Sequence, residues 1–366
     1  MKLYHKWIYV LFSIFVAALL IYSYSLIDLN LTLFNDELWL LARDSLVRLG
    51  YFQRELSSYI YIAVVLVLFY FHWLFTKNYK VVSFWKVVIP LLFLGVSSYP
   101  LLSHDFFNYM FDAKILTFYH QNPYVMRPLD FPSDPWLRFM HWVHRTYPYG
   151  PVFLPITLIP SFLSFGKFVL AFYLFKATST FFYLAGSLSL FKMNKKWAIF
   201  FATNPLVVIE GLVNGHNDMI AAGLALIGIY FLFQKKNLFS RTFFLLSGGI
   251  KYLTIPFLIL SREKKHILNK IAFSLLVCLL LYLSITQEVQ PWYFLGILPF
   301  IVFFEGLISK LSLFFAGLLL SYFPYIRFGE WDTPWKINLK HQIIIGFLVA
   351  NAVYLLPKLK TKFFKR

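Results

Sequence analysis

The chain has 366 residues, of which 60% are hydrophobic and only 14% are charged, and this balance excludes a water-soluble globular protein. The formal net charge of +18 does not indicate nucleic-acid binding, because the basic residues lie in short segments between apolar runs, as membrane orientation requires. We therefore expect an all-α, polytopic integral membrane protein with a single domain and no nucleic-acid partner.

Ten apolar runs predict membrane crossings, because a helix needs about 20 apolar residues to span the hydrocarbon core. The runs are 7–27, 58–75, 83–102, 168–191, 197–213, 218–233, 267–285, 292–304, 312–328 and 341–357. Lysine and arginine gather in the loops on one side and in the C-terminal tail, which predicts that both termini are cytoplasmic. Nearly all carboxylates fall on the opposite, outer side.

Two further runs do not fit a simple crossing. The run 151–166 contains Pro155 and Pro160, so it predicts a re-entrant or tilted segment. The run 240–261 is interrupted by Gly248, Gly249 and Lys251, which predicts a hairpin of two half-length helices with Lys251 at its outer apex. Together with the ten crossings, these runs predict a bundle of about 10 to 13 transmembrane helices.

The longest polar stretch, 103–150, is expected to be a large outer loop that contains interfacial helices. Asp105 begins a segment compatible with a helix over 106–120. The sequence Ser133-Asp134-Pro135 combines a cap with proline at the first helical position, and it predicts a second helix lying flat on the bilayer. Arg138 and Arg145 would share its polar face, where they fit either lipid headgroups or a phosphate clamp.

Six short motifs along the chain resemble those of a known family. They are Ser103-His104-Asp105, Asn122-Pro123-Tyr124, Tyr147-Pro148-Tyr149-Gly150-Pro151, Asn214-Gly215-His216-Asn217-Asp218, Gly249-Ile250-Lys251-Tyr252 and Gln290-Pro291-Trp292-Tyr293. Their order and shared outer placement resemble the GT-C membrane glycosyltransferases, and in particular the polyprenyl-phosphate-mannose-dependent mannosyltransferases. The resemblance covers 83–304 as a catalytic core, with two extra N-terminal helices in 1–82 and C-terminal helices and a basic tail in 305–366.

The resemblance implies a GT-C-like helical bundle in the cell (inner) membrane, with its active site on the extracytoplasmic side. It implies transfer of a hexose, which the family resemblance gives as mannose, from a polyprenyl-phosphate-linked donor to a glycan, lipid or protein acceptor, among membrane lipids. Such a transfer needs a general base, a cation for the leaving phosphate and an aromatic surface for the sugar. Asp105 is the expected catalytic base, with Asp36 and Glu37 as the alternative pair. Direct attack assisted by one carboxylate would invert the anomeric centre.

Eight residues are expected to bind the phosphate or sugar of the donor: Lys251, Arg127, His216, Asn217, Asp218, Tyr149, Trp292 and Tyr293. Simpler explanations exist for several of them. Asn217 and Asp218 can cap a helix, Lys251 can extend to the membrane interface, and Trp292 and Tyr293 can belong to an aromatic belt. No metal site or other cofactor is predicted, although a divalent cation near Asp105 or Asp218 is compatible with the sequence.

Two other functions compete with this one. A transporter or flippase for lipid-linked sugars would carry ionisable groups at mid-membrane depth, whereas Glu210, Asp218 and Arg327 fall at the outer ends of apolar runs. An oligosaccharide ligase or polymerase with a diphosphate-linked donor would need a larger basic cluster near its acid. Lys176 lies within an apolar run, and its sequence context assigns it no role.

Overall fold

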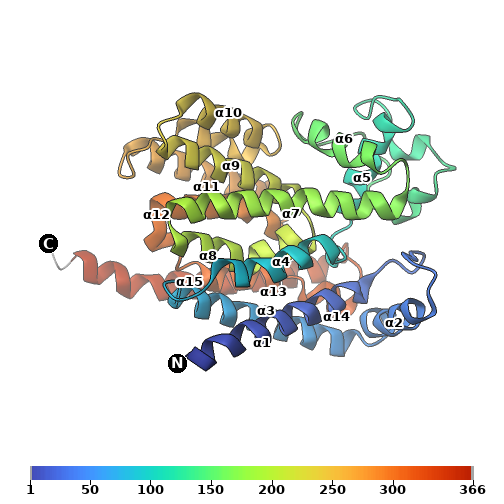
Figure 1. Ribbon diagram of the computed structural model, residues 1–366, viewed down its shortest axis with the longest axis horizontal. Coiled ribbons are helices and arrows are strands. Elements are labelled where there is room, and N and C mark those ends of the chain that lie inside the picture. The colour runs from blue at the N-terminus through green and yellow to red at the C-terminus, as the bar shows by residue number, and fades with distance from the viewer. Residues whose placement is uncertain (1, 364–366) are drawn as a thin grey trace.

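The computed structural model describes residues 2–363, and their side chains over 7–356, and within that range every regular element is helical (Figure 1). Six segments are long and apolar enough to cross a membrane. They are α1 (Lys2–Ser23) with the turn η1 (Tyr24–Leu26), α3 (Arg54–Lys77), α7 (Phe168–Met193), α11 (Ile267–Thr286), η7 (Pro291–Phe300) with α12 (Ile301–Ile308), and α15 (Pro334–Phe363). The described chain is thus a multi-pass helical membrane protein, as its composition predicts.

The other four predicted crossings also form helices, but these are bent or short. The pair α8 (Lys195–Thr203) and η5 (Val207–Val213) is bent by 67°, and it passes the length test only if both helices count as one span. The shorter elements are α4 (Phe84–Ser97), α9 (Asn217–Phe233), and α13 (Ser312–Leu320) with α14 (Phe323–Phe328). The structure therefore contains six spans by length, or seven with the bent pair, which is fewer than the ten predicted. One reason is local, because Pro100 disfavours helix at the residue before it and α4 stops at Ser97.

The predicted hairpin is confirmed. Helix α10 (Asn237–Gly248) and the 3₁₀ helix η6 (Tyr252–Ile259) pack against each other, with Lys251 in the turn between them. The proline-containing run forms the short helix α6 (Phe153–Leu163).

In the outer loop, α5 (Asp105–Thr117) starts at the predicted residue and ends three residues before the predicted boundary at His120. The predicted second interfacial helix is wrong. Asp134 does cap the segment by accepting from the Trp136 N–H at 2.8 Å, but only the 3₁₀ turn η4 (Pro135–Phe139) follows. Trp136 and Phe139 are buried in the protein, so the segment packs inward and does not lie on lipid. A further 3₁₀ turn, η3 (Pro128–Asp130), precedes it.

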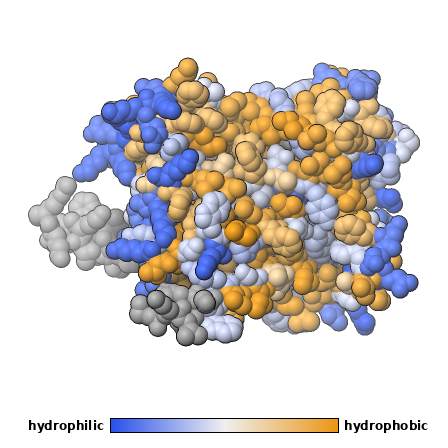
Figure 2. All heavy atoms as spheres, in the orientation of Figure 1, coloured by the Kyte–Doolittle hydropathy of each residue, from blue (hydrophilic) through white to orange (hydrophobic). Residues whose placement is uncertain are grey.

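Polarity is distributed as a membrane requires. Figure 2 shows hydrophilic residues at the left and right ends of the molecule, with hydrophobic residues filling the middle. The two termini lie toward the left end, whereas α5, α6 and the pair α2 (Glu37–Val47) and η2 (Arg48–Phe52) lie toward the right (Figure 1). The outer loop and the chain termini are therefore at opposite ends of the bundle.

A cluster of buried hydrophobic side chains holds α5 inside the protein. Phe106 through Ile115 are all buried, and the rings of Phe106 and Phe107 pack on Phe172 of α7 at 5.5 and 6.4 Å between centroids. This packing holds the first residue of α5, Asp105, at the inner edge of the loop.

Candidate active site

A cavity of about 450 Å³ opens at the end of the bundle that carries the outer loop. Its walls come from segments that are distant in sequence. Residues that line it include Ser103, His104, Asp105, His141, Trp142, Arg145, Tyr149, Lys251, Gln287, Glu288, Gln290, Trp292, Tyr293, Trp331 and Asp332. Five of the predicted site residues are thus brought together: Asp105, Tyr149, Lys251, Trp292 and Tyr293.

Asp105 is held in place by contacts from two other segments. Its Oδ1 accepts a hydrogen bond from the Trp142 indole N–H at 3.1 Å. Its Oδ2 lies 3.9 Å from Nδ1 of His216, which is too far for a hydrogen bond. The Asp105 carboxylate is thus held in place at the start of α5, and its side chain is 18% exposed, enough to meet a substrate.

His216 lies behind the Asp105 carboxylate, on the side away from the cavity. Its ring stacks on Trp292 with centroids 3.9 Å apart and planes 15° apart, and its Nε2 lies 3.5 Å from Oε2 of Glu210. Burial, together with the positive charge of Lys251, lowers the pKa of His216 well below its usual value. The imidazole is therefore neutral at physiological pH. It does not line the cavity directly, and it supports Asp105 and Trp292 from behind.

The turn before α9 sets the position of the His216 side chain. Gly215 has a positive φ of 71°, a conformation that favours glycine, and a Cβ there would lie 3.1 Å from the Phe106 ring. Asn214 connects this turn to the segment before Asp105, because its Oδ1 accepts from the Leu102 N–H at 3.1 Å and its Nδ2 donates to Glu210 at 2.9 Å. The segment Asn214-Gly215-His216 therefore fixes both the His216 ring and the residues that lead into Asp105.

Lys176 has a structural role that its sequence context did not reveal. Its ammonium donates to the carbonyls of Leu212 at 2.5 Å and Val213 at 2.8 Å, and to Ser98 Oγ at 3.0 Å. The last carbonyls of a helix have no partner within the helix, so the amine satisfies the end of η5. This contact fixes the residues that immediately precede Asn214.

Lys251 forms the cationic side of the cavity. Its Nζ lies 3.1 Å from Oδ2 of Asp218 and 5.2 Å from the centre of the Tyr293 ring. The Lys251 side chain is 20% exposed and that of Asp218 only 5%. Asp218 is therefore the buried partner of Lys251. Asn217 does not cap α9, and its side-chain amide is buried with no hydrogen-bond partner among the described residues.

The loop that carries Tyr149 rests directly on the hairpin turn. The Val152 N–H donates to the carbonyl of Gly249 at 3.0 Å, and a Cβ on Gly150 would lie only 2.1 Å from that same oxygen. Only glycine fits at position 150. This contact sets Tyr149 beside the turn that carries Lys251.

Sequence reasoning missed several residues of the cavity. Arg145 was expected on the polar face of a helix that does not form, where it fitted either lipid headgroups or a phosphate clamp. In the structure its guanidinium lies 4.8 Å from the centre of the Trp142 ring and donates to the Tyr149 hydroxyl at 3.4 Å. Trp331 and Asp332 reach the cavity from near the C-terminus. Local sequence carries no signal for these two contacts, whereas the charge of Arg145 in the outer loop was visible.

The structure does not bring Arg127 or the alternative acids into this cavity. Arg127 is exposed and pairs with Asp130 at 3.0 Å, three residues along the chain. Asp36 caps α2 by accepting from the N–H groups of Leu38 and Trp39, and Glu37 is exposed beside it. Asp36 thus has a capping role at the start of α2, outside the cavity.

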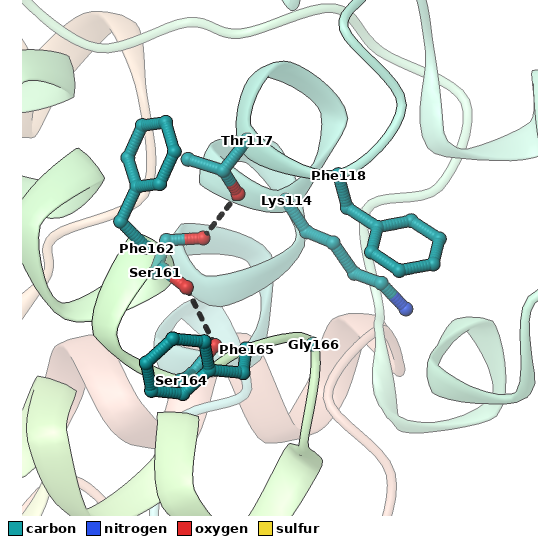
Figure 3. Close-up of a pocket in the computed structure, with 8 residues that line it drawn as sticks. All are labelled: Lys114, Thr117, Phe118, Ser161, Phe162, Ser164, Phe165 and Gly166. Carbon is teal, nitrogen blue, oxygen red and sulfur yellow. Dashed lines mark hydrogen bonds between the residues drawn. The ribbon is translucent and has the colours of Figure 1, made fainter.

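A smaller cavity of about 200 Å³ between α5 and α6 holds no predicted site residue (Figure 3). The hydroxyls of Thr117 and Ser161 are hydrogen-bonded to each other there at 2.7 Å, and Lys114 points away from them. Lys114 instead forms a buried ion pair with Asp134 at 2.5 Å. This pair joins α5 to η4 and stands outside the candidate active site.

The described side chains contain no group of three or more His, Cys, Asp or Glu arranged to hold a metal ion. Asp218, one of the two residues considered for a divalent cation, already forms an ion pair with Lys251. Asp218 is therefore not free to bind a divalent cation, and a cation near Asp105 stays a prediction.

Residues 43–261 match the model of the MptA_B family, which is described as alpha-(1->6)-mannopyranosyltransferase, N-terminal domain. The chain belongs to this family. The matched range covers more than half of the chain and contains Asp105, Trp142, His216 and Lys251, whereas Trp292 lies beyond it. No curated protein and no solved structure matched the chain. Membership confirms the expected resemblance and identifies a glycosyltransferase of the mannosyltransferase kind in a multi-pass membrane protein.

Proposed function

We propose that this protein transfers a mannosyl residue from a polyprenyl-phosphate mannose donor to a glycan, lipid or protein acceptor at the outer face of the cell membrane, with inversion. The observation that carries the proposal is the cavity itself. It combines one fixed carboxylate, Asp105, with a cation, Lys251, and aromatic rings from three separate segments. A base, a cation and an aromatic surface are the three groups that the transfer needs.

An apolar groove supports a lipid-linked donor. A cavity of about 470 Å³, lined almost wholly by apolar residues of α11, η7, α13 and α15, includes Val289. The residues on either side of it in sequence, Glu288 and Gln290, line the polar cavity. This segment therefore borders both cavities. A donor with its sugar phosphate beside Lys251 and its isoprenoid chain in the groove would occupy both, whereas a nucleotide sugar would leave the groove empty.

The arrangement performs the transfer in one displacement. Asp105 accepts the proton of the acceptor hydroxyl as that oxygen attacks C1 of the mannose, and the bond between C1 and the phosphate oxygen breaks. The lipid phosphate leaves with the electron pair, and the positive charges of Lys251 and Arg145 stabilise it. The Trp142 N–H orients Asp105. Because attack and departure occur on opposite faces of C1, a β-linked donor gives an α-linked product, and an α-(1→6) linkage would agree with the family description.

A transfer assay with two matched acid variants tests the proposal. Membranes containing the protein receive radiolabelled polyprenyl-phosphate mannose, and label in glycan is measured for the parent, Asp105→Asn and Asp36→Asn. General-base assistance contributes roughly 10²- to 10⁴-fold, so we expect Asp105→Asn to reduce transfer by at least about 10²-fold. Asp36→Asn, which removes the charge of an exposed residue and keeps a side-chain oxygen for the cap, should stay near the parent rate.

Other outcomes would redirect the assignment. Transfer that survives Asp105→Asn removes the proposed base, and a selective loss in Asp36→Asn transfers that role to the alternative pair. Movement of intact lipid-linked sugar between leaflets without transfer favours the transporter, and transfer only from a diphosphate-linked donor favours the ligase.

Membrane orientation has its own test. In a Cys278→Ala background, Val125→Cys in the exposed outer loop should react with an impermeant thiol reagent added outside intact cells. Lys236→Cys, in the exposed basic loop before α10, should react only after the membrane is opened. The reverse pattern refutes an extracytoplasmic active site.

A further inference from the structure

The largest of the described cavities, about 780 Å³, lies at the other end of the bundle from the candidate active site. Helix α3 shows where this cavity lies, because the helix runs from the active-site end of the bundle to the other end. Arg54 at its start donates to the carbonyl of Ile326, which is close in sequence to Trp331 of the candidate active site. Lys77 at the end of α3 lines the large cavity. These two residues are 23 positions apart on one helix, a rise of roughly 35 Å. The cavity therefore lies at the basic end, near the termini.

The mouth of this cavity carries more positive charge than the protein neutralises. Lys77, Lys196 and Lys310 all line it. Lys196 is paired with Glu305 at 2.6 Å. Lys77 lies 4.7 Å from the centre of the Trp73 ring, and neither it nor Lys310 has a carboxylate partner among the described side chains. Two ammonium groups are thus free to bind an anion.

The inner part of the cavity is apolar. Its lining includes Leu66, Phe69, Phe200, Leu313, Ala316, Leu320 and Phe347, from α3, α8, α13 and α15. From Lys77 to Leu66 the helix rises by roughly 16 Å, which is close to the thickness of one hydrocarbon leaflet, about half of 30 Å. The dimensions fit a single acyl chain that runs from the interface to the bilayer midplane.

We infer that this cavity binds an anionic phospholipid, with its phosphate between Lys77 and Lys310 and one acyl chain along α3 and α13. Basic pockets between transmembrane helices are suited to anionic headgroups. A free phosphate would use only the mouth and leave the apolar interior unfilled. The site is independent of the proposed donor site, because the two cavities share no lining residue.

Native mass spectrometry of the delipidated full chain tests this inference. We expect the parent to retain one phosphatidylglycerol in preference to phosphatidylcholine of the same acyl chains. Each lysine near an anionic headgroup contributes about fivefold, so Lys77→Gln with Lys310→Gln should weaken phosphatidylglycerol binding by roughly 25-fold. The matched control is Lys265→Gln with Lys270→Gln, two exposed lysines at the same end that line neither cavity, and it should bind as the parent does.

A second variant tests the acyl part of the site. Ala316→Trp fills the apolar interior while leaving both lysines in place, and it should abolish retention of the long-chain lipid. Thermal unfolding of each variant separates lost binding from lost folding. Equal retention of the two lipids by the parent, or equal weakening by the control pair, overturns the inference. Binding of polyprenyl phosphate or inorganic phosphate in preference to phosphatidylglycerol overturns the assignment to a phospholipid.

Discussion

Lys251 can be tested for two separate roles, as the partner of Asp218 and as the cation for the departing phosphate. Replacing Lys251 with Met leaves a carboxylate whose side chain is only 5% exposed without its counter-charge. Breaking a buried pair costs about 3 to 5 kcal/mol, and we expect about 3 kcal/mol because Lys251 itself is 20% exposed. Adding Asp218→Asn removes the isolated charge and should return the free energy of unfolding to within about 1 kcal/mol of the parent.

Activity should not return with stability. The double variant still lacks a cation beside the leaving group, so its mannosyl transfer per folded molecule should remain about 10²-fold below the parent. The assay combines thermal unfolding in detergent with transfer from radiolabelled donor, both on the same preparation. Lys114→Met is the matched control, because it breaks another buried lysine–aspartate pair in the outer loop but lies outside the cavity. It should lose stability and keep its turnover. Recovery of transfer in the double variant would refute the phosphate role of Lys251.

Three further substitutions probe the surroundings of Asp105. Trp142→Phe removes the 3.1 Å hydrogen bond to the Asp105 carboxylate and should lower kcat by roughly 10-fold with little change in KM. The reason is that hydrogen bonds to charged groups contribute about 1.5 kcal/mol or more. An unchanged kcat would contradict the orienting role of Trp142. Gly215→Ala forces an L side chain to a φ of 71°, so it should cost about 1 to 2 kcal/mol of stability and reduce transfer, as thermal unfolding and the transfer assay will show. Burial raises the pKa of Asp112 to about 8, with Arg145 opposing the shift and Asp105 adding to it. The folded state therefore keeps a proton that the unfolded state loses between pH 4 and 8, and stability falls as pH rises through this window. Asp112→Asn should then stabilise the protein more at pH 8 than at pH 5, by at most about 4 kcal/mol. A difference in Tm that is the same at both pH values would disprove the burial argument.

The features that could be predicted from sequence are those with a local signature. Asp105 at the start of a helix and the break at Gly248 and Gly249 were both recoverable, because helix boundaries depend on neighbouring residues. The site motifs had a recognisable order. Their meeting in one cavity was expected from the side of the membrane on which each was predicted to lie.

The features that could not be predicted depend on tertiary contacts. The Trp142 indole reaches Asp105 across 37 positions, and the periodicity around it indicated a helix where the chain forms only the 3₁₀ turn η4. Lys176 binds backbone carbonyls, which leave no trace in the side-chain sequence. The pairing of Arg127 with Asp130, by contrast, is local, and their spacing of three was a visible sign against a phosphate role.

The contact between Gly150 and Gly249 has a consequence for how substrate enters. Without room for even a methyl group between them, the two backbones act as a closed seam on one flank of the cavity, and parting them would break the bond from Val152 to Gly249. A long isoprenoid of the donor proposed above would then have to enter elsewhere, and the apolar groove that includes Val289 has the lining that suits it. A disulfide that holds the seam closed should therefore leave turnover intact.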